Sequence, residues 1–368
     1  MASKQLDQQD SRSSVAFGDT LSPLWDSSAK GGSRVEGFGD SVLPEGEVIC
    51  MSRQLSLADV LVDARLGSNA KLSRIDALID WSQVEGLVAG LRSGETGRPP
   101  YAALSMLKAL YLQALYDLSD PGLEEALTDR LSFRRFCGFA LDSATPDETT
   151  ICRFRLAAAK AGVLQRCLAE VNRQLDQRGL MLKKGTLMDA SIVAATHNPP
   201  RREAGMGAGH PREPGADWTA KNGKSFFGYK LHVGVDEVSG LIRKAVFTSA
   251  RTPDNDMAEA LISGDEAAVY ADRIYESKKR RASLKAQGIK DRIMHRRHKH
   301  MPLLPRWMAA RNRLISKRRA PVESVFSAMK RIYGKARTRC HSLTANAADF
   351  LAFVTVFNLR RATAVLIP

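Results

Sequence analysis

The sequence has few cysteines and no long apolar run. Its five cysteines among 368 residues are odd in number and lack the paired spacing of zinc ligands, which excludes a disulfide framework and indicates reduced thiols. No apolar run reaches the roughly 18 residues that a membrane span needs. The polar N-terminus has no apolar signal-peptide core. These absences predict a cytoplasmic protein with no membrane partner.

Basic residues are abundant and unevenly placed. Lys and Arg number 55 against 40 Asp and Glu, which gives a net charge of +15. Residues 1–50 hold four basic and eight acidic residues, whereas residues 273–320 hold seventeen basic and two acidic ones. A basic protein favours an anionic partner, most commonly nucleic acid. We therefore expect residues 273–320 to contact DNA.

The chain is long enough for two domains and a tail. Residues 1–50 are rich in Ser, Gly and Asp without periodicity, which predicts a disordered tail. Met51 opens the first orderly stretch and is a candidate alternative start. We expect residues 51–180 to form an all-helical N-terminal domain for DNA-end binding or dimerisation, and residues 181–368 to form a mixed α/β catalytic domain.

Helix signals are clear in the first half. Ser119-Asp120-Pro121 predicts a helix start with Asp120 as its N-cap, and Thr145 with Glu148 has the spacing of a capping box. Two apolar stripes have helical spacing. They are Leu107, Leu110, Tyr111, Ala114, Leu115 and Leu118, then Leu164, Cys167, Leu168, Val171 and Leu175. The second stripe predicts that Cys167 is buried.

The pattern changes after Gly179. Strands are predicted at 185–193, 226–235, 241–248 and 267–271, and helices at 256–262, 276–287, 321–333 and 343–364. The Pro- and Gly-rich residues 197–217 predict a loop. This order of strand, hairpin, helix, strand and helices fits a mixed sheet covered by helices, as in the ribonuclease-H-like arrangement.

Three carboxylates stand at positions suited to metal-assisted phosphodiester chemistry. Asp189 lies within a strand, Asp272 ends the apolar strand at 267–271, and Glu323 lies in the first turn of the helix that Pro321 opens. Hard divalent ions prefer such oxygen ligands. Each residue also has an ordinary structural alternative, such as a turn carboxylate or an acid favoured by the helix dipole. Spacing alone does not separate the two interpretations.

Several long motifs resemble the DDE transposases of bacterial insertion sequences, in the branch named for insertion sequence five. The similarity covers residues from about 55 to 360. Its motifs are GRPPY (97–101), ALYDLSDPGLEEALTDRLSFRRFCGF (114–139), PDETTICRFR (146–155), GTLMDASIVAA (185–195), NGKSFFGYKLHVGVDEVSGLI (222–242), AVYAD (268–272) and RRAPVESVFSAMKR (318–331).

The resemblance implies a ribonuclease-H-like catalytic domain in which Asp189, Asp272 and Glu323 bind two Mg²⁺ ions, with Mn²⁺ as a substitute. These residues would nick DNA at transposon ends and join the freed 3′-hydroxyl to target DNA. Arg319 and Lys330 keep the family's spacing around Glu323.

Two positions depart from the family's pattern. Ser316 replaces the family's Tyr in the signature around Glu323, and residues 251–254, Arg-Thr-Pro-Asp, replace its Asn-X-His-Asp stretch. The Tyr substitution leaves the three acidic positions intact. A dimer on DNA is expected by analogy.

Candidate DNA contacts follow from charge. Arg319, Lys330, Lys224 and Lys230 are expected at phosphates, since phosphate contacts supply most of the affinity. Thr149, Thr150, Arg153 and Arg155 begin a helix that could contact the major groove or pack within the helical domain. Trp218 could stack on a base or pack internally.

Other interpretations stay open. The chain could be a DNA-binding relative without catalysis, or a stand-alone metal nuclease that does not join strands. His295, His298 and His300 could bind zinc but lack cysteine partners. His232, in a strand beside Lys230, is expected to be structural or near a phosphate.

Overall fold

The computed structural model describes residues 69–91, 100–199 and 210–366. The tail expected at residues 1–50, the candidate start at Met51 and most of the 97–101 motif lie outside the described residues. No helix in the described ranges has the length and apolar character of a membrane span.

Helices make up the first half of the described chain. α4 is its central element, because it is buried along nearly its whole length and contacts helices on several sides. The helices are α2 (Ala70–Leu78), α3 (Trp81–Val88), η1 (Ala89–Leu91), α4 (Ala103–Tyr116), α5 (Asp120–Asp129), α6 (Leu131–Cys137), α7 (Glu148–Lys160) and α8 (Val163–Gln177).

The caps of two helices differ from the sequence prediction. The side chain of Ser119, not Asp120, caps α5, and it accepts a hydrogen bond from the backbone N–H of Gly122. Asp147 caps α7 in place of Thr145 by accepting from Thr150 N–H at 2.6 Å. The helices therefore start within two or three residues of the predicted positions, but a different side chain accepts the hydrogen bond from the free N–H.

A mixed sheet forms the second half. Its strands are β1 (Thr186–Ala194), β2 (Asp217–Lys221), β3 (Lys224–Asp236), β4 (Ile242–Ser249), β5 (Ala268–Ala271) and β6 (Lys290–Ile293). β3 pairs antiparallel with β1 and β4, whereas β1, β5 and β6 run parallel. The order β4-β3-β1-β5-β6 is that of a ribonuclease-H-like fold, as the sequence predicted.

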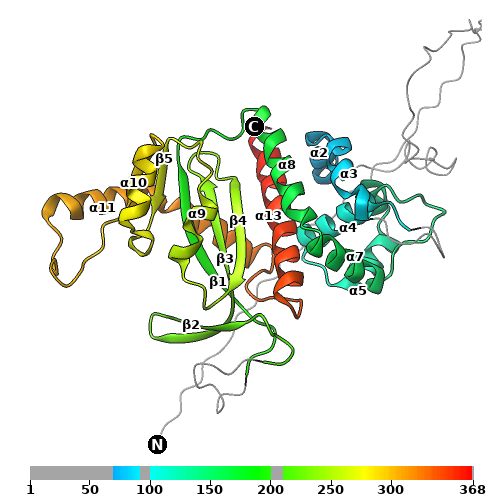
Figure 1. The fold of residues 1–368 in the computed structure, drawn as a ribbon. Helices are drawn as coiled ribbons and strands as arrows, with labels where there is room; N and C mark the ends of the chain where they lie inside the picture. The colour runs from blue at the N-terminus through cyan, green and yellow to red at the C-terminus, as the bar shows by residue number, and fades with distance from the viewer. Residues whose placement is uncertain (1–68, 92–99, 200–209, 367–368) are drawn as a thin grey trace, which may run out of the picture. The chain divides into compact units, whose positions relative to one another are not determined.

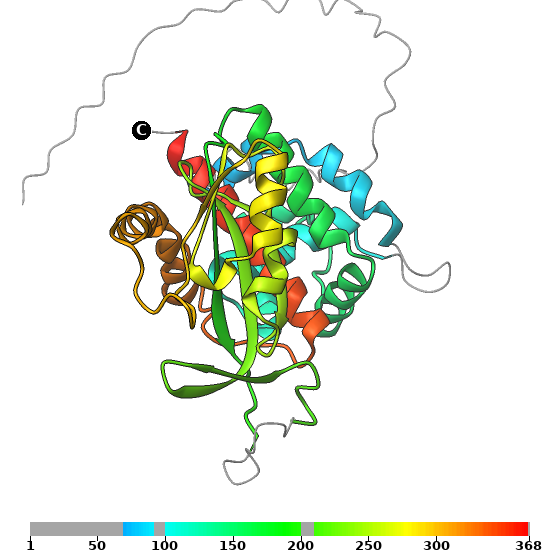
Figure 2. The ribbon, with the colours of Figure 1, turned by 60° about the vertical axis from the view of Figure 1, so that its left-hand side comes forward.

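Two strands and one helix were missed by the sequence analysis. β2 lies at the end of the expected loop and forms a hairpin with β3, while β6 and α11 (Arg306–Arg319) lie in the basic stretch. The β2–β3 turn uses Asn222 and Gly223, both with positive φ, which suits a two-residue hairpin turn. This hairpin extends from one end of the sheet (Figure 2).

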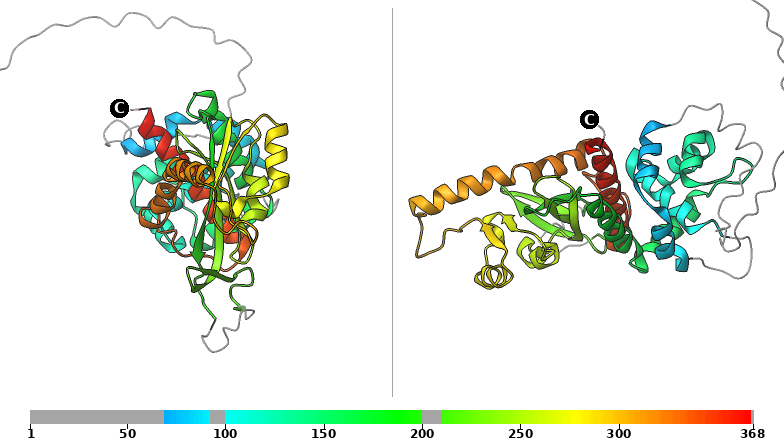
Figure 3. Two further views of the ribbon diagram at one scale, coloured as in Figure 1. Left: turned by 90° about the vertical axis from the view of Figure 1, so that its left-hand side faces the viewer. Right: turned by 90° about the horizontal axis from the view of Figure 1, so that it is seen from above.

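Helices cover both faces of the sheet. α9 (Ala258–Leu261), which follows η2 (Asp254–Met257), and α10 (Lys278–Ala286), which follows η3 (Arg273–Tyr275), pack on one face. α12 (Pro321–Arg331) and α13 (Leu343–Val365) pack on the other (Figures 1 and 2). α11 runs into α12 with only Ala320 between them, as the view from above shows (Figure 3).

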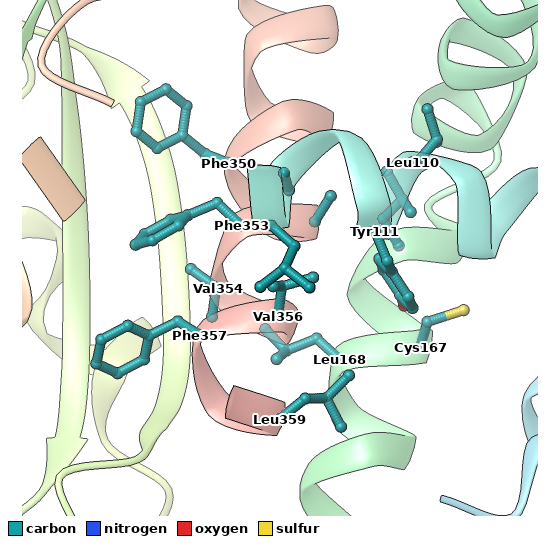
Figure 4. Packing of buried hydrophobic residues seen from close by; sticks show 14 of the residues in the cluster. Leu110, Tyr111, Cys167, Leu168, Phe350, Phe353, Val354, Val356, Phe357 and Leu359 are labelled. Carbon is teal, nitrogen blue, oxygen red and sulfur yellow. The ribbon is translucent and has the colours of Figure 1, made fainter. Parts of the chain in front are cut away.

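α13 joins the sheet to the helical half. Phe350, Phe353 and Phe357 lie on its sheet side, and Val356 and Leu359 face α4 and α8 (Figure 4). One continuous hydrophobic cluster therefore contains residues of both halves. Cys167 is fully buried in this cluster, as predicted, and burial raises the pKa of its thiol to about 12.

Candidate active site

Asp189 and Asp272 are brought together by strand register. β1 and β5 are parallel neighbours in which Leu187 pairs with Tyr270. Continuing this register by two residues places Asp189 beside Asp272. Neighbouring strands lie about 4.8 Å apart, so two carboxylates at one level of adjacent strands face a common space. Burial is the main cause of the raised pKa of Asp189, and the negative charge of Asp272 adds to it.

Arg319 and Glu323 lie one helical turn apart, where α11 continues into α12. Arg319 ends α11, Ala320 keeps helical dihedral angles, and Glu323 lies in the first turn of α12. Residues four apart on a helix share a face. Arg319 donates from Nη2 to Asp189 Oδ2 at 2.8 Å, which fixes the orientation of that face. Since α12 packs against β1, Glu323 lies one turn beyond this contact, with its side chain exposed.

The electrostatics of Asp189 reflect its position at the edge of the core. Burial raises the pKa of the Asp189 carboxyl, and the Arg319 guanidinium only partly offsets this effect. The backbone N–H of Ala190 also donates to Asp189 Oδ1 at 2.9 Å. A carboxylate with an elevated pKa beside another carboxylate gains stability from any further positive charge at this point.

The three carboxylates offer the hard oxygen donors that a divalent ion prefers. Arg319 contacts Asp189 from the side of α11–α12, so the positive charge beside Asp189 is at present a guanidinium. Among the described residues, one group of three potential ligands has its atoms within 4.8 Å of one another, namely His197, Glu213 and His341, whereas Asp189, Asp272 and Glu323 do not form such a group. The donor set therefore fits a divalent ion by its chemistry.

Two lysines add positive charge to this region. Lys330, on α12, has its pKa lowered by partial desolvation and by the charge of Lys221. The charge of Lys221 also opposes the burial that raises the pKa of Asp189, so the end of β2 acts on the same region as α12. Lys224, on the other side of the hairpin turn, is exposed. The sequence predicted three phosphate contacts in this region. Arg319 contacts Asp189, Lys330 lies on α12 with Glu323, and Lys224 lies at the tip of the β2–β3 hairpin.

Comparison with protein families assigns both halves of the chain. Residues 60–156 match a transposase domain of the family called DUF772, and residues 181–359 match the transposase DDE domain. The second match includes the strands and helices that carry Asp189, Asp272 and Glu323. The chain is a DDE transposase. No solved structure matched it in a separate comparison.

Lys230 has a different place in the transposase from the one expected. Its side chain is buried, donates to the Thr252 carbonyl at 2.9 Å and pairs with Asp254 at the same distance. His232 is fully buried on the same face of β3, and its Nε2 lies 2.9 Å from Thr248 Oγ1. Lys230 therefore holds residues 251–254, the segment that differs from the family's pattern, against the sheet. This placement argues against a phosphate contact.

The helix considered for groove contact is only partly accessible. Arg153 and Thr149 of α7 are exposed, but Arg155 is buried and bonds to Asp120 and to Gln113. Arg155 therefore ties α7 to α4 and α5 and cannot enter a DNA groove from this position. Trp218 packs on Phe227 with ring centroids 5.3 Å apart, which is the internal packing alternative.

The basic stretch of the transposase divides into internal and exposed charges. Arg280 is buried and pairs with Glu259, while Arg281 pairs with Asp291 and Glu276. The exposed basic side chains of this stretch are Arg273, Lys278, Lys279, Lys285, Lys290, Arg292, Arg296, Arg297, Lys299, Arg306, Arg313, Lys317 and Arg318. Charge counting from sequence could not distinguish the two kinds, because the distinction depends on which acids lie nearby.

The histidines of the basic stretch do not form a metal cluster in the described residues. His295 lies 3.5 Å from Glu276, and His298 and His300 are exposed. Burial and the neighbouring Arg281 and Arg311 lower the pKa of His295. This environment disfavours the charged form of His295, and the backbone of His295 bonds to Asn312 on α11.

Proposed function

We propose that this transposase cuts DNA at the ends of its own element and joins the freed 3′-hydroxyl to target DNA, with Asp189, Asp272 and Glu323 as its metal-binding residues. The observation that supports the proposal is the parallel register of β1 with β5, which, continued by two residues, brings Asp189 level with Asp272, together with the contact of Arg319 with Asp189. The spacing from Arg319 to Glu323 and Lys330 supports the same assignment. The branch named for insertion sequence five is part of the proposal.

The donor chemistry supports two Mg²⁺ ions, with Mn²⁺ as a substitute. When bound, two such ions stabilise the attacking and leaving oxygens of an in-line phosphoryl transfer. Asp189 and Asp272 would hold them from the sheet, and Glu323 would hold them from α12. Arg319, released from Asp189, is placed to contact a non-bridging phosphate oxygen through its planar guanidinium.

Positioning of DNA would come from surfaces around these residues. Lys330 on α12 and Lys224 on the hairpin are exposed cations that can follow a phosphate backbone. Arg153 on α7 is a further candidate at the transposon end. We propose that two copies act together on DNA, because the two ends of an element must be brought together before joining.

The test is cleavage of a labelled DNA that carries the element's own ends, with Mg²⁺ present, by wild type and by Asp189→Ala. We expect cleavage by wild type and none by the variant, with equal DNA binding by the two proteins. Cleavage that survives in Asp189→Ala would show that the metal-binding carboxylate is another residue.

Strand joining separates this proposal from a nuclease of the same fold. Incubation of the cut ends with target plasmid should give joined products that depend on Mg²⁺. Cleavage without joined products would establish a nuclease, and binding without cleavage by either protein would establish a relative that only binds DNA.

A further inference from the structure

Three potential metal ligands that do not include Asp189, Asp272 or Glu323 gather at the base of the β2–β3 hairpin. His197 follows β1, Glu213 precedes β2, and His341 precedes α13. One ligand atom from each of the three lies within 4.8 Å of the others. Residues 197 and 341 are far apart in sequence, so their spacing gave no signal of this group.

Glu213 is an unusual member of the group because it is fully buried. Its Oε2 accepts a hydrogen bond from the Tyr229 hydroxyl at 2.9 Å. Its Oε1 accepts from the backbone N–H of His197 at 3.3 Å and lies 3.6 Å from His197 Nδ1. A buried carboxylate is costly unless it has a positive partner. The two neutral donors alone leave the charge of Glu213 uncompensated.

His197 supplies the second observation. Its Nδ1 is buried without a hydrogen-bond partner in the described structure, and it faces Glu213 Oε1. Two ligands bound at about 2.0–2.1 Å in a tetrahedral zinc site lie about 3.3 Å apart. The separation of 3.6 Å is close to that value, so a zinc ion placed between these atoms would satisfy both.

The backbone holds the three residues in place. The segment before His341 runs beside the end of β1, where Thr338 N–H donates to the Ala194 carbonyl at 2.9 Å. Thr196 Oγ1 also donates to the Thr338 carbonyl at 2.5 Å. Gly215 lies so close to α13 that a Cβ there would be 2.6 Å from Leu343 Cβ. The ligands are thus preorganised by three chain segments that contact one another.

Neighbouring groups favour nitrogen and oxygen ligands over sulfur. The ring of His341 lies 5.1 Å from the ring of His197, centroid to centroid. Cys340, the adjacent residue, has its pKa raised to about 11 by burial, and its sulfur accepts from Arg155. A neutral thiol in that contact is a poor ligand. Two histidines and one glutamate are a donor set found in zinc sites that keep a fourth position for water.

We propose that His197, Glu213 and His341 bind one Zn²⁺ ion, which fixes the base of the β2–β3 hairpin to the end of β1 and the start of α13. Tyr229 is the positioning residue, because its hydroxyl orients Glu213. The site is separate from Asp189, Asp272 and Glu323 and does not depend on the proposed DNA chemistry.

The test uses the full-length protein, stripped of metal and titrated with Zn²⁺ against a chromophoric chelator, with bound zinc counted by elemental analysis. The wild-type protein should bind one Zn²⁺ ion per chain tightly. His341→Ala and His197→Ala should each weaken this binding at least about 100-fold, since loss of an outer-shell partner alone costs 10–100-fold. Tyr229→Phe should weaken it about 10-fold or more.

Two controls make the outcome decisive. His298→Ala removes an exposed histidine elsewhere, and this variant should still bind one Zn²⁺ ion per chain tightly. Asp189→Ala should also bind it, and that result would exclude zinc on the proposed catalytic carboxylates. Zinc should raise the Tm of wild type and not that of His341→Ala, whose exposed side chain can be removed without opening the core. The absence of a tight equivalent in wild type, or its survival in both histidine variants, would overturn the proposal.

Discussion

Two ion pairs of similar length lie in very different surroundings. Lys335 and Asp349 are 2.5 Å apart, with side chains 1% and 3% exposed, between α12 and α13. Arg319 and Asp189 are 2.8 Å apart, with side chains 14% and 25% exposed, where α11–α12 meets β1. The first pair is enclosed by protein, whereas the second opens to solvent beside Asp272.

The difference indicates which pair can exchange partners. Burial opposes the charge of Asp349, but Lys335 and Arg339 still lower its pKa, so the carboxylate stays ionised through protein contacts alone. Burial raises the pKa of Asp189, and its cation does not fully compensate. A buried pair loses much when either partner is removed. A partly buried carboxylate whose charge is incompletely compensated, such as Asp189, can accept a metal ion instead.

The largest effect is expected at Asp272 and Glu323, the other two carboxylates proposed to bind metal with Asp189. Asp272→Asn and Glu323→Gln should each lower Mg²⁺-dependent cleavage by about 10⁴-fold or more, or roughly 5 kcal/mol, because a metal ligand stabilises the transition state. Both changes keep side-chain size, and Asn still caps the turn that Asp272 begins. Cleavage rates and Tm values measured on the same preparations check this prediction.

The prediction is confirmed if each variant loses cleavage activity while its Tm stays nearly unchanged. If Tm fell in parallel with activity, these carboxylates would resemble Asp349 and would have a structural role. Lys317→Ala, an exposed change on α11, is the control for surface substitution near the site.

The buried pair should show the opposite behaviour. Asp349→Asn leaves the Lys335 ammonium buried without its partner, and we expect a loss of about 3–5 kcal/mol in the free energy of unfolding. Denaturant unfolding at pH 7 measures this loss. The double variant Asp349→Asn, Lys335→Met should recover part of it, because no uncompensated charge remains. An equal loss in the single and double variants would refute the argument from charge.

Much of the carboxylate site could be predicted from sequence because its signals are local. Asp189 in an apolar strand, Asp272 at the end of another and Glu323 after a helix-opening proline are each visible within a few residues. The strand order of the predicted fold makes the strand of Asp189 a neighbour of the strand that Asp272 follows, but it does not give their register. Their distance from one another is not local, and the contact of Arg319 with Asp189 could not be predicted.

The missed features depend on tertiary contacts. Lys230 and Arg155 have the sequence character of DNA-binding residues, but Asp254 and Asp120 lie close enough to hold them inside the fold. β2 was hidden because its pairing with β3 matters more than its own short, polar sequence. Glu213 gave no signal, since its burial depends on Tyr229 and on segments distant in sequence.

A smaller effect is expected from His232, which is buried like Asp349 but carries no charge at neutral pH. Burial lowers its pKa to about 4; Asp254 opposes this shift, and Lys230 adds to it. Between about pH 6.5 and 4 the unfolded chain binds a proton that the folded chain does not. Stability should therefore fall by about 2–3 kcal/mol as the pH drops through this window.

Unfolding free energies of wild type and His232→Asn at several pH values check this sign. The variant should lose less stability than wild type between pH 6.5 and 4, whatever its stability at pH 7. Asp254 and Lys230 remain in both proteins, so the difference isolates His232. Equal pH slopes would show that another group titrates in this window.

The smallest effect is expected from a fully open cation, Lys224, which no described ion pair holds and which lies beside the hairpin turn. If it contacts a phosphate, Lys224→Ala should weaken DNA binding modestly for all sequences and reduce the slope of log K against log salt by about 0.9. Lys230→Ala is the informative contrast, because its buried ammonium should affect stability more than salt slope. Binding isotherms at four salt concentrations measure the slopes. A larger change in slope for Lys230 than for Lys224 would reverse the distinction between paired and open cations on which the comparison rests.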